Sequence, residues 1–131
     1  MGRGTKGLAG GVVALVAAVV ATGCGAGADA GGGTGPEAAP DTSRGEQLFQ
    51  ANCAVCHGES GLGTANGPPL IHDVYEPGHH PDASFHQAVA DGVVAHHWDF
   101  GNMPPVPGLD RGEVDDIVAW VREQQRAAGI E

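Results

Sequence analysis

Residues 53–57 read CAVCH, and this stretch decides how the rest of the chain can fold. Two cysteines that are separated by two residues and followed directly by a histidine form the signature of covalent c-type haem attachment. Both thiols can reach one edge of a porphyrin and form thioether bonds, and the histidine can then ligate the iron through Nε2. We therefore expect one covalent haem c, attached through Cys53 and Cys56 and ligated by His57.

Two other uses of a C-x-x-C pair fit this sequence less well. A redox-active dithiol of the thioredoxin type needs a strand, a turn and a helix around the pair, but residues 57–63 read HGESGLG and do not offer that context. A structural zinc site needs a second pair of ligands, and the chain has no other C-x-x-C. The sequence therefore favours haem attachment.

Length and charge restrict the fold and the partners. The 131 residues leave room for one small domain, and with 5% aromatic residues a haem would supply much of its apolar centre. Without the leader residues Arg3 and Lys6, four basic residues stand against 16 acidic ones, a formal charge of −12. This charge argues against nucleic acid as a partner. It fits a redox partner with a basic docking surface, and it fits a role in solubility equally well.

The first 24 residues have the parts of a bacterial secretory leader, with a basic start and an apolar stretch over residues 8–20. The leader ends in Ala21-Thr22-Gly23-Cys24, which resembles the lipobox of bacterial lipoproteins, although Ala21 stands where Leu is usual. In that family the cysteine is acylated and becomes the new N-terminus. We expect a lipid on Cys24 that anchors the protein at the extracytoplasmic face of a membrane. Cleavage elsewhere would give a soluble periplasmic protein.

Residues 25–42 are predicted to be a flexible tether. They contain Gly, Ala, Thr, Pro and acidic residues but no large apolar side chain, so nothing in them offsets the entropy lost on ordering. A Gly-rich chain of this length has a root-mean-square span of roughly 20–25 Å. The folded domain is expected over residues 43–131.

The first helix of this domain is predicted to begin at Ser43 and to run directly into the haem motif. Ser43 would be its N-cap, and Glu46 would complete a capping box. Gly45 and Phe49 share one face of this helix. A glycine on a buried helical face indicates a close crossing by another helix.

Two further helices complete an all-α fold of three main helices around the haem. Pro81 suits the first turn of the second helix, and Gly92 suits its end. In the third helix Asp110 can cap the start, with Glu113 at the third position, and Gly129 ends it. No strand pattern is present.

Met103 is the candidate sixth ligand of the iron. It is the only methionine besides the initiator, and a thioether ligand favours the ferrous state. Pro104 and Pro105 would stiffen the backbone that presents its sulfur. His96 and His97, just upstream, are the rival ligands, and the alternative for Met103 is an ordinary core position.

From about residue 43 to residue 129 the chain resembles the class I monohaem c-type cytochromes, on the strength of the CAVCH motif and Met103. The resemblance implies one-electron transfer between a redox-protein donor and acceptor, without turnover of a substrate. The chain has no lysine outside its leader, so a lysine-ringed docking face is not implied. Two rival functions are a haem enzyme or gas sensor, in which Met103 dissociates, and a histidine-rich metal-binding haem protein.

The same resemblance implies two contacts inside the domain. Pro68 would accept a hydrogen bond from Nδ1–H of the axial histidine through its carbonyl, which fixes the ring. Gly45 and Phe49 would pack against an aromatic residue of the last helix, Trp120.

The remaining polar candidates are histidine pairs and one tryptophan. His79-His80 and His96-His97 could form a copper or zinc site, but solvated loop residues that bond to haem propionates or backbone are the favoured interpretation. Trp98 has an indole N–H for which a haem propionate is a candidate acceptor.

Overall fold

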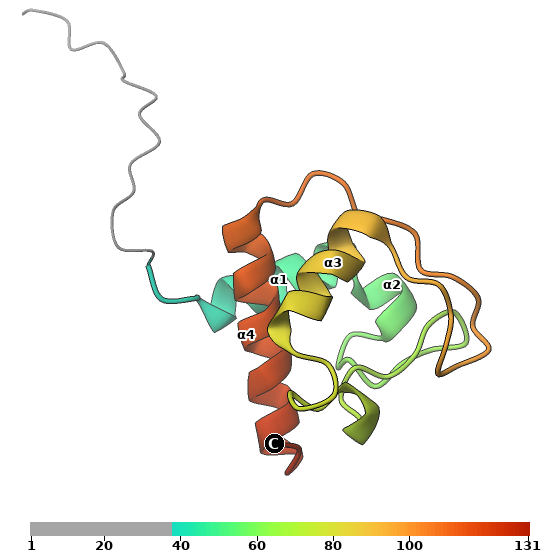
Figure 1. Cartoon of the computed structure of the whole chain (residues 1–131). Coiled ribbons are helices and arrows are strands. Elements are labelled where there is room, and N and C mark those ends of the chain that lie inside the picture. The colour runs from blue at the N-terminus through green and yellow to red at the C-terminus, as the bar shows by residue number, and fades with distance from the viewer. Residues whose placement is uncertain (1–37) are drawn as a thin grey trace, which may run out of the picture. The chain divides into compact units, whose positions relative to one another are not determined.

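The computed structural model describes residues 38–131 of the chain (Figure 1). The predicted leader, Cys24 and most of the predicted tether lie outside the described residues. The elements are α1 (Thr42–Asn52), α2 (Ala54–His57), a 3-10 turn η1 (Asp73–Tyr75), α3 (Asp82–Asp91) and α4 (Arg111–Ala127). The described part contains isolated β-bridges but no strand, which confirms the all-α fold. The three expected helices are α1, α3 and α4, and the haem motif adds the short α2.

None of the helices within residues 38–131 is both long enough and apolar enough to cross a bilayer.

The start of α1 differs from the prediction. Asp41 is the N-cap, and its carboxylate accepts hydrogen bonds from the backbone N–H groups of Ser43 and Arg44. The predicted capping box of Ser43 and Glu46 is therefore wrong. The cause lies on α4, where Oδ1 of Asp116 accepts a hydrogen bond of 2.7 Å from the backbone N–H of Asp41. This contact fixes Asp41 at the start of the helix, two residues inside the segment predicted as tether.

The ends of the other helices follow the sequence more closely. Pro81 is the N-cap of α3 and not its first helical residue, so that boundary moves by one position. Gly92 caps α3 at the C-terminal end with a φ of 76°, a conformation that favours glycine. The capping box of Asp110 and Glu113 at the start of α4 is confirmed, and Gly129 follows the end of that helix.

The core lies where α1 crosses α4 (Figure 1). A Cβ atom on Gly45 would lie 2.0 Å from the backbone oxygen of Asp116, so only glycine permits this approach. Phe49 is fully buried, and its ring centroid lies 4.5 Å from that of Trp120. The predicted packing of Gly45 and Phe49 on Trp120 is confirmed. The haem motif follows directly after α1, and Ile117 and Val121 of α4 belong both to this core and to the lining of the cavity beside the motif.

Candidate functional site

A cavity of about 710 Å³ lies between α2, α3, α4 and the loop that follows α3. Its volume falls within the roughly 300–1,000 Å³ of typical ligand and cofactor sites. Aliphatic side chains of α3 and α4, such as Val89 and Val118, form part of its wall. Cys53, His57 and Met103 all line it, so the motif and the predicted sixth ligand meet at one place although they are far apart in the sequence.

His57 is held in the orientation that a ligated histidine needs. It is the last residue of α2 and is only 8% exposed. Its Nδ1 lies 2.8 Å from the carbonyl oxygen of Pro68, and a carbonyl can only accept, so Nδ1 carries the proton and donates. Nε2 then keeps its lone pair for a metal. Burial lowers the pKa of His57, and the hydrogen bond to Pro68 opposes that shift.

Cys53 is the N-cap residue of α2, and Cys56 lies inside this helix. The two cysteines form no disulfide with each other, and both line the cavity. Burial, and then the neighbouring Cys56, raise the pKa of Cys53 to about 11. A redox-active dithiol needs the opposite shift, because the thiolate is the reactive form. This environment argues against the thioredoxin-like alternative.

Met103 is positioned by backbone contacts. It forms a two-way β-bridge with Val93, in which each N–H donates to the other residue's carbonyl at 2.9 Å. A Cβ atom on Gly92 would lie 2.5 Å from the backbone oxygen of Met103, so glycine is required for this approach. The bridge closes a loop over residues 94–102 and holds Met103 at the loop's base.

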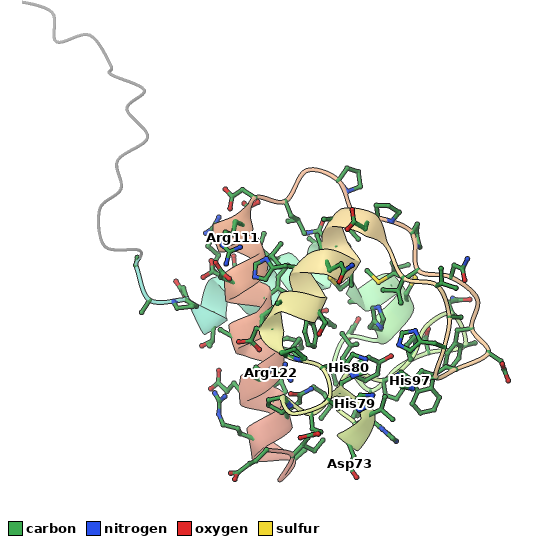
Figure 2. The ribbon with its side chains drawn as sticks, in the orientation of Figure 1. Asp73, His79, His80, His97, Arg111 and Arg122 are labelled. Carbon is green, nitrogen blue, oxygen red and sulfur yellow. The ribbon has the colours of Figure 1, made fainter. Side chains whose placement is uncertain are left out.

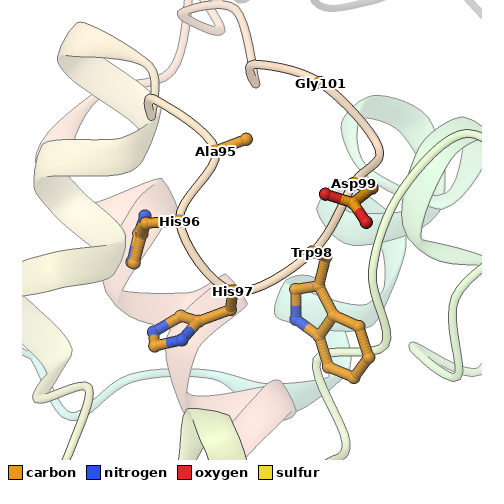
Figure 3. A pocket seen from close by; sticks show the side chains of 6 residues that line it. All are labelled: Ala95, His96, His97, Trp98, Asp99 and Gly101. Carbon is orange, nitrogen blue, oxygen red and sulfur yellow. The ribbon is translucent and has the colours of Figure 1, made fainter.

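This loop carries the polar rim of the cavity. Figure 3 shows His96, His97 and Trp98 following one another along it, before it curves round to Asp99 and Gly101. Nε1 of Trp98 is buried and forms no hydrogen bond of good geometry within residues 38–131, although it lies near the side chain of Tyr75, where it opposes the larger effect of burial, which raises the pKa of Tyr75. A buried indole N–H usually donates to something. An anionic group at the cavity's edge would satisfy it.

The cavity fits a haem on two grounds. The orphaned indole N–H of Trp98 suits a propionate, as the sequence led us to expect. Three apolar side chains that line the cavity, those of Val55, Val94 and Phe100, are 77%, 75% and 39% exposed in the polypeptide. An apolar ring bound there would remove part of this surface from water. Cys53 and Cys56 would hold such a ring covalently, and His57 and Met103 would supply its axial ligands.

Besides Asp116, sequence reasoning missed two further buried polar residues of α4. Arg122 donates to the carbonyls of Tyr75 and His80, and the amide of Gln125 donates to the carbonyls of Leu70 and Tyr75. They are 7% and 1% exposed, and Arg122 also donates to Oε1 of Gln125. Together they attach the loop over residues 70–80 to α4. In the sequence, these two residues could be recognised only as polar residues at helical positions that continue the apolar face of the last helix.

Of the six histidines outside the haem motif, two lie apart, three form a cluster, and the sixth, His96, lies beside that cluster. His86 pairs with Asp115 of α4 at 2.7 Å, and His72 accepts a hydrogen bond from the N–H of Val74. Both have partners inside the fold. His79, His80 and His97 instead lie together (Figure 2), and two of them, His80 and His97, line the cavity.

A family model described as cytochrome c matches residues 42–125 of the chain, well over half of its length. No curated protein and no solved structure gives a significant match.

Proposed function

The chain belongs to the cytochrome c family, and on this premise we propose that it carries single electrons between two larger redox proteins, with His57 and Met103 as its axial ligands. At the general level a member of this family is a haem-based electron-transfer protein. The proposal adds the ligand pair, the covalent attachment through Cys53 and Cys56, and the role of a free carrier.

One observation carries the proposal. His57 and Met103 line the same cavity, and each is held by contacts that involve backbone atoms. The ring of His57 is fixed by the carbonyl of Pro68, and the backbone of Met103 is fixed by its bridge with Val93. Ligands that hardly move when the iron changes its oxidation state suit electron transfer. A labile ligand, as an enzyme or gas sensor needs, would gain nothing from such anchoring.

Each residue around the cavity has a separate role in electron transfer by a bound haem. A bound haem supplies an iron that alternates between Fe(III) and Fe(II). The hydrogen bond to Pro68 raises the basicity of His57 and keeps Nε2 directed at the metal. The thioether of Met103 favours the reduced state. The aliphatic wall from α3 and α4 would shield a bound haem from water, and Trp98 would offer its N–H to a propionate.

Met103→Ala in the haem-loaded protein tests the ligand pair. The wild type should have a low-spin absorption spectrum in both oxidation states and should resist carbon monoxide. The variant should bind carbon monoxide. Its reduction potential should fall measurably, because the identity of the iron ligands changes haem potentials over a range of roughly 0.8 V. His96→Ala is the control and should leave the spectrum unchanged. A Met103→Ala protein that stays low-spin would overturn the pair in favour of two histidines, and ready carbon monoxide binding by the wild type would favour an enzyme or sensor.

We extend the proposal to location and partners. A lipid on Cys24 would anchor the protein at the extracytoplasmic face of a bacterial membrane, and residues 25–42 would let the domain reorient. The acidic domain would dock on a basic face of its partner, so electron transfer should slow as ionic strength rises. Mass analysis of the mature N-terminus tests the lipid, and an unmodified Cys24 would contradict it.

A further inference from the structure

Three imidazole rings from two separate segments meet on the rim of the haem cavity. His79 and His80 follow the 3-10 turn, whereas His97 belongs to the loop closed by the bridge between Val93 and Met103. One nitrogen of each ring lies within 4.8 Å of the corresponding nitrogens of the other two. Figure 2 shows the three residues side by side.

The spacing of these nitrogens suits a tetrahedral metal ion. Zn–N bonds of about 2.0–2.1 Å at a tetrahedral angle place neighbouring ligand nitrogens about 3.3–3.4 Å apart. The Nε2 atoms of His79 and His97 lie 3.4 Å apart. The third nitrogen, from His80, lies within 4.8 Å of both, so the three atoms are close enough for one ion to draw them together. Three imidazoles that leave a fourth position for water form a common zinc arrangement.

His80 has the second contact that metal-ligating histidines usually show. Its Nδ1 lies 2.6 Å from the carbonyl oxygen of Val74, so Nδ1–H donates to that oxygen and Nε2 keeps its lone pair. Its own carbonyl accepts a hydrogen bond from Arg122, which fixes the backbone at this point. Partial burial is the main cause that lowers the pKa of His80. A lowered pKa keeps the ring neutral at pH 7, as ligation requires.

We propose that His79, His80 and His97 bind one divalent transition-metal ion, of the Zn²⁺ or Cu²⁺ class, on the rim of the haem cavity. Imidazole nitrogen suits both ions, and the absence of any carboxylate or thiol from the three-ring cluster disfavours Mg²⁺ and Ca²⁺, which prefer oxygen. His96 is a neighbour of the cluster, with its ring centroid 4.3 Å from that of His97. Its Nδ1 lies 2.8 Å from the carbonyl of Val94, and it is not among the three convergent ligands.

Calorimetric titration of the untagged, haem-loaded protein with Zn²⁺ tests the site. Zn²⁺ is the probe because it exchanges no electrons with the haem. The wild type should bind one ion per chain, and His79→Gln or His97→Gln should each weaken binding at least tenfold. His80→Asn is the sharper variant, since its amide can still donate to Val74 while the ligand at the Nε2 position is gone. It should weaken binding by the same factor.

His86→Gln is the matched control. The new amide can still donate to Asp115, while one imidazole outside the cluster is removed. It should bind Zn²⁺ as the wild type does. Four results would overturn the proposal: no saturable binding by the wild type, equal weakening by His86→Gln, unchanged binding by His80→Asn, or a His97→Gln protein with an altered haem spectrum. The last result would place His97 on the iron.

Discussion

The crossing of α1 with α4 and the loop-built face around the cavity are held together in different ways. At the crossing, Phe49 packs on Trp120 at a centroid distance of 4.5 Å, and the backbones approach so closely that Gly45 has no room for a side chain. Around the cavity the chain is mostly irregular. There, Arg122 and Gln125 reach from α4 to hold backbone carbonyls of the loop over residues 70–80.

The difference shows what each region lacks without the haem. The crossing buries its own apolar side chains against one another, but few of them are fully buried, so we expect it to be too small to fold alone. The cavity face leaves Val55 and Val94 about three-quarters exposed, at 77% and 75%, and leaves the indole N–H of Trp98 without an acceptor. We infer that the polypeptide supplies the packing at the crossing, whereas the cofactor supplies part of the packing at the cavity face.

Loss of the haem should have the largest effect, and it tests whether the crossing of α1 and α4 folds without the cofactor. Cys53→Ser combined with Cys56→Ser should abolish covalent haem attachment. Because few side chains of this small domain are fully buried, the haem-free chain should also lose its cooperative unfolding transition. Haem staining after denaturing electrophoresis and thermal unfolding followed by circular dichroism measure the two effects. A haem-free chain that still unfolds cooperatively would show the crossing to be an independent unit.

Trp120→Ala should have the next largest effect. Removing a buried tryptophan leaves a cavity between α1 and α4, and we expect it to lower the free energy of unfolding of the haem-loaded protein by about 3–5 kcal/mol. The haem spectrum should not change, since Trp120 is not among the cavity-lining residues. Denaturant unfolding measures the loss. Leu62→Ala, at a side chain that is 66% exposed, should change stability by less than about 0.5 kcal/mol.

Gly45→Ala tests the closeness of the crossing. The added Cβ meets the backbone oxygen of Asp116, so the helices must move apart, at a cost of about 1–3 kcal/mol. Gly112→Ala is the matched control on α4, where the nearest atom to a new Cβ is Oδ1 of Asp110 at 3.5 Å. It should leave stability unchanged or raise it by up to about 1 kcal/mol. Equal unfolding free energies for Gly45→Ala and the wild type would contradict the packing described.

The smallest expected loss of stability comes from a substitution that loosens the loop over residues 70–80. Gln125→Met keeps the volume but removes the donor to the carbonyls of Leu70 and Tyr75 and one acceptor of Arg122, which should cost about 1–2 kcal/mol. Hydrogen exchange should speed up at the amides of residues 70–80 and stay slow in α1. Gln124→Ala, one position away, should be close to neutral. A uniform increase in exchange across both regions would show that the network stabilises the whole domain.

Local patterns predicted the features whose partners are close in the chain. Asp110 and Glu113 form the capping box of α4 as expected, because the two residues are three positions apart. The same kind of pattern failed at α1, where Ser43 and Glu46 fit the motif but Asp41 is the cap. There the N–H of Asp41 bonds to Asp116 on α4, a partner that no local window contains.

The sequence by itself determined the family, the haem motif and the three main helices, because attachment chemistry and helical periodicity depend on residues a few positions apart. Tertiary structure decided the attachment of residues 70–80 by Arg122 and Gln125, and the meeting of His79 and His80 with His97. These features depend on how α4 and two loops approach one another. The donors of α4 act on backbone carbonyls, which every residue carries, so no pattern of side chains in the sequence identifies their partners.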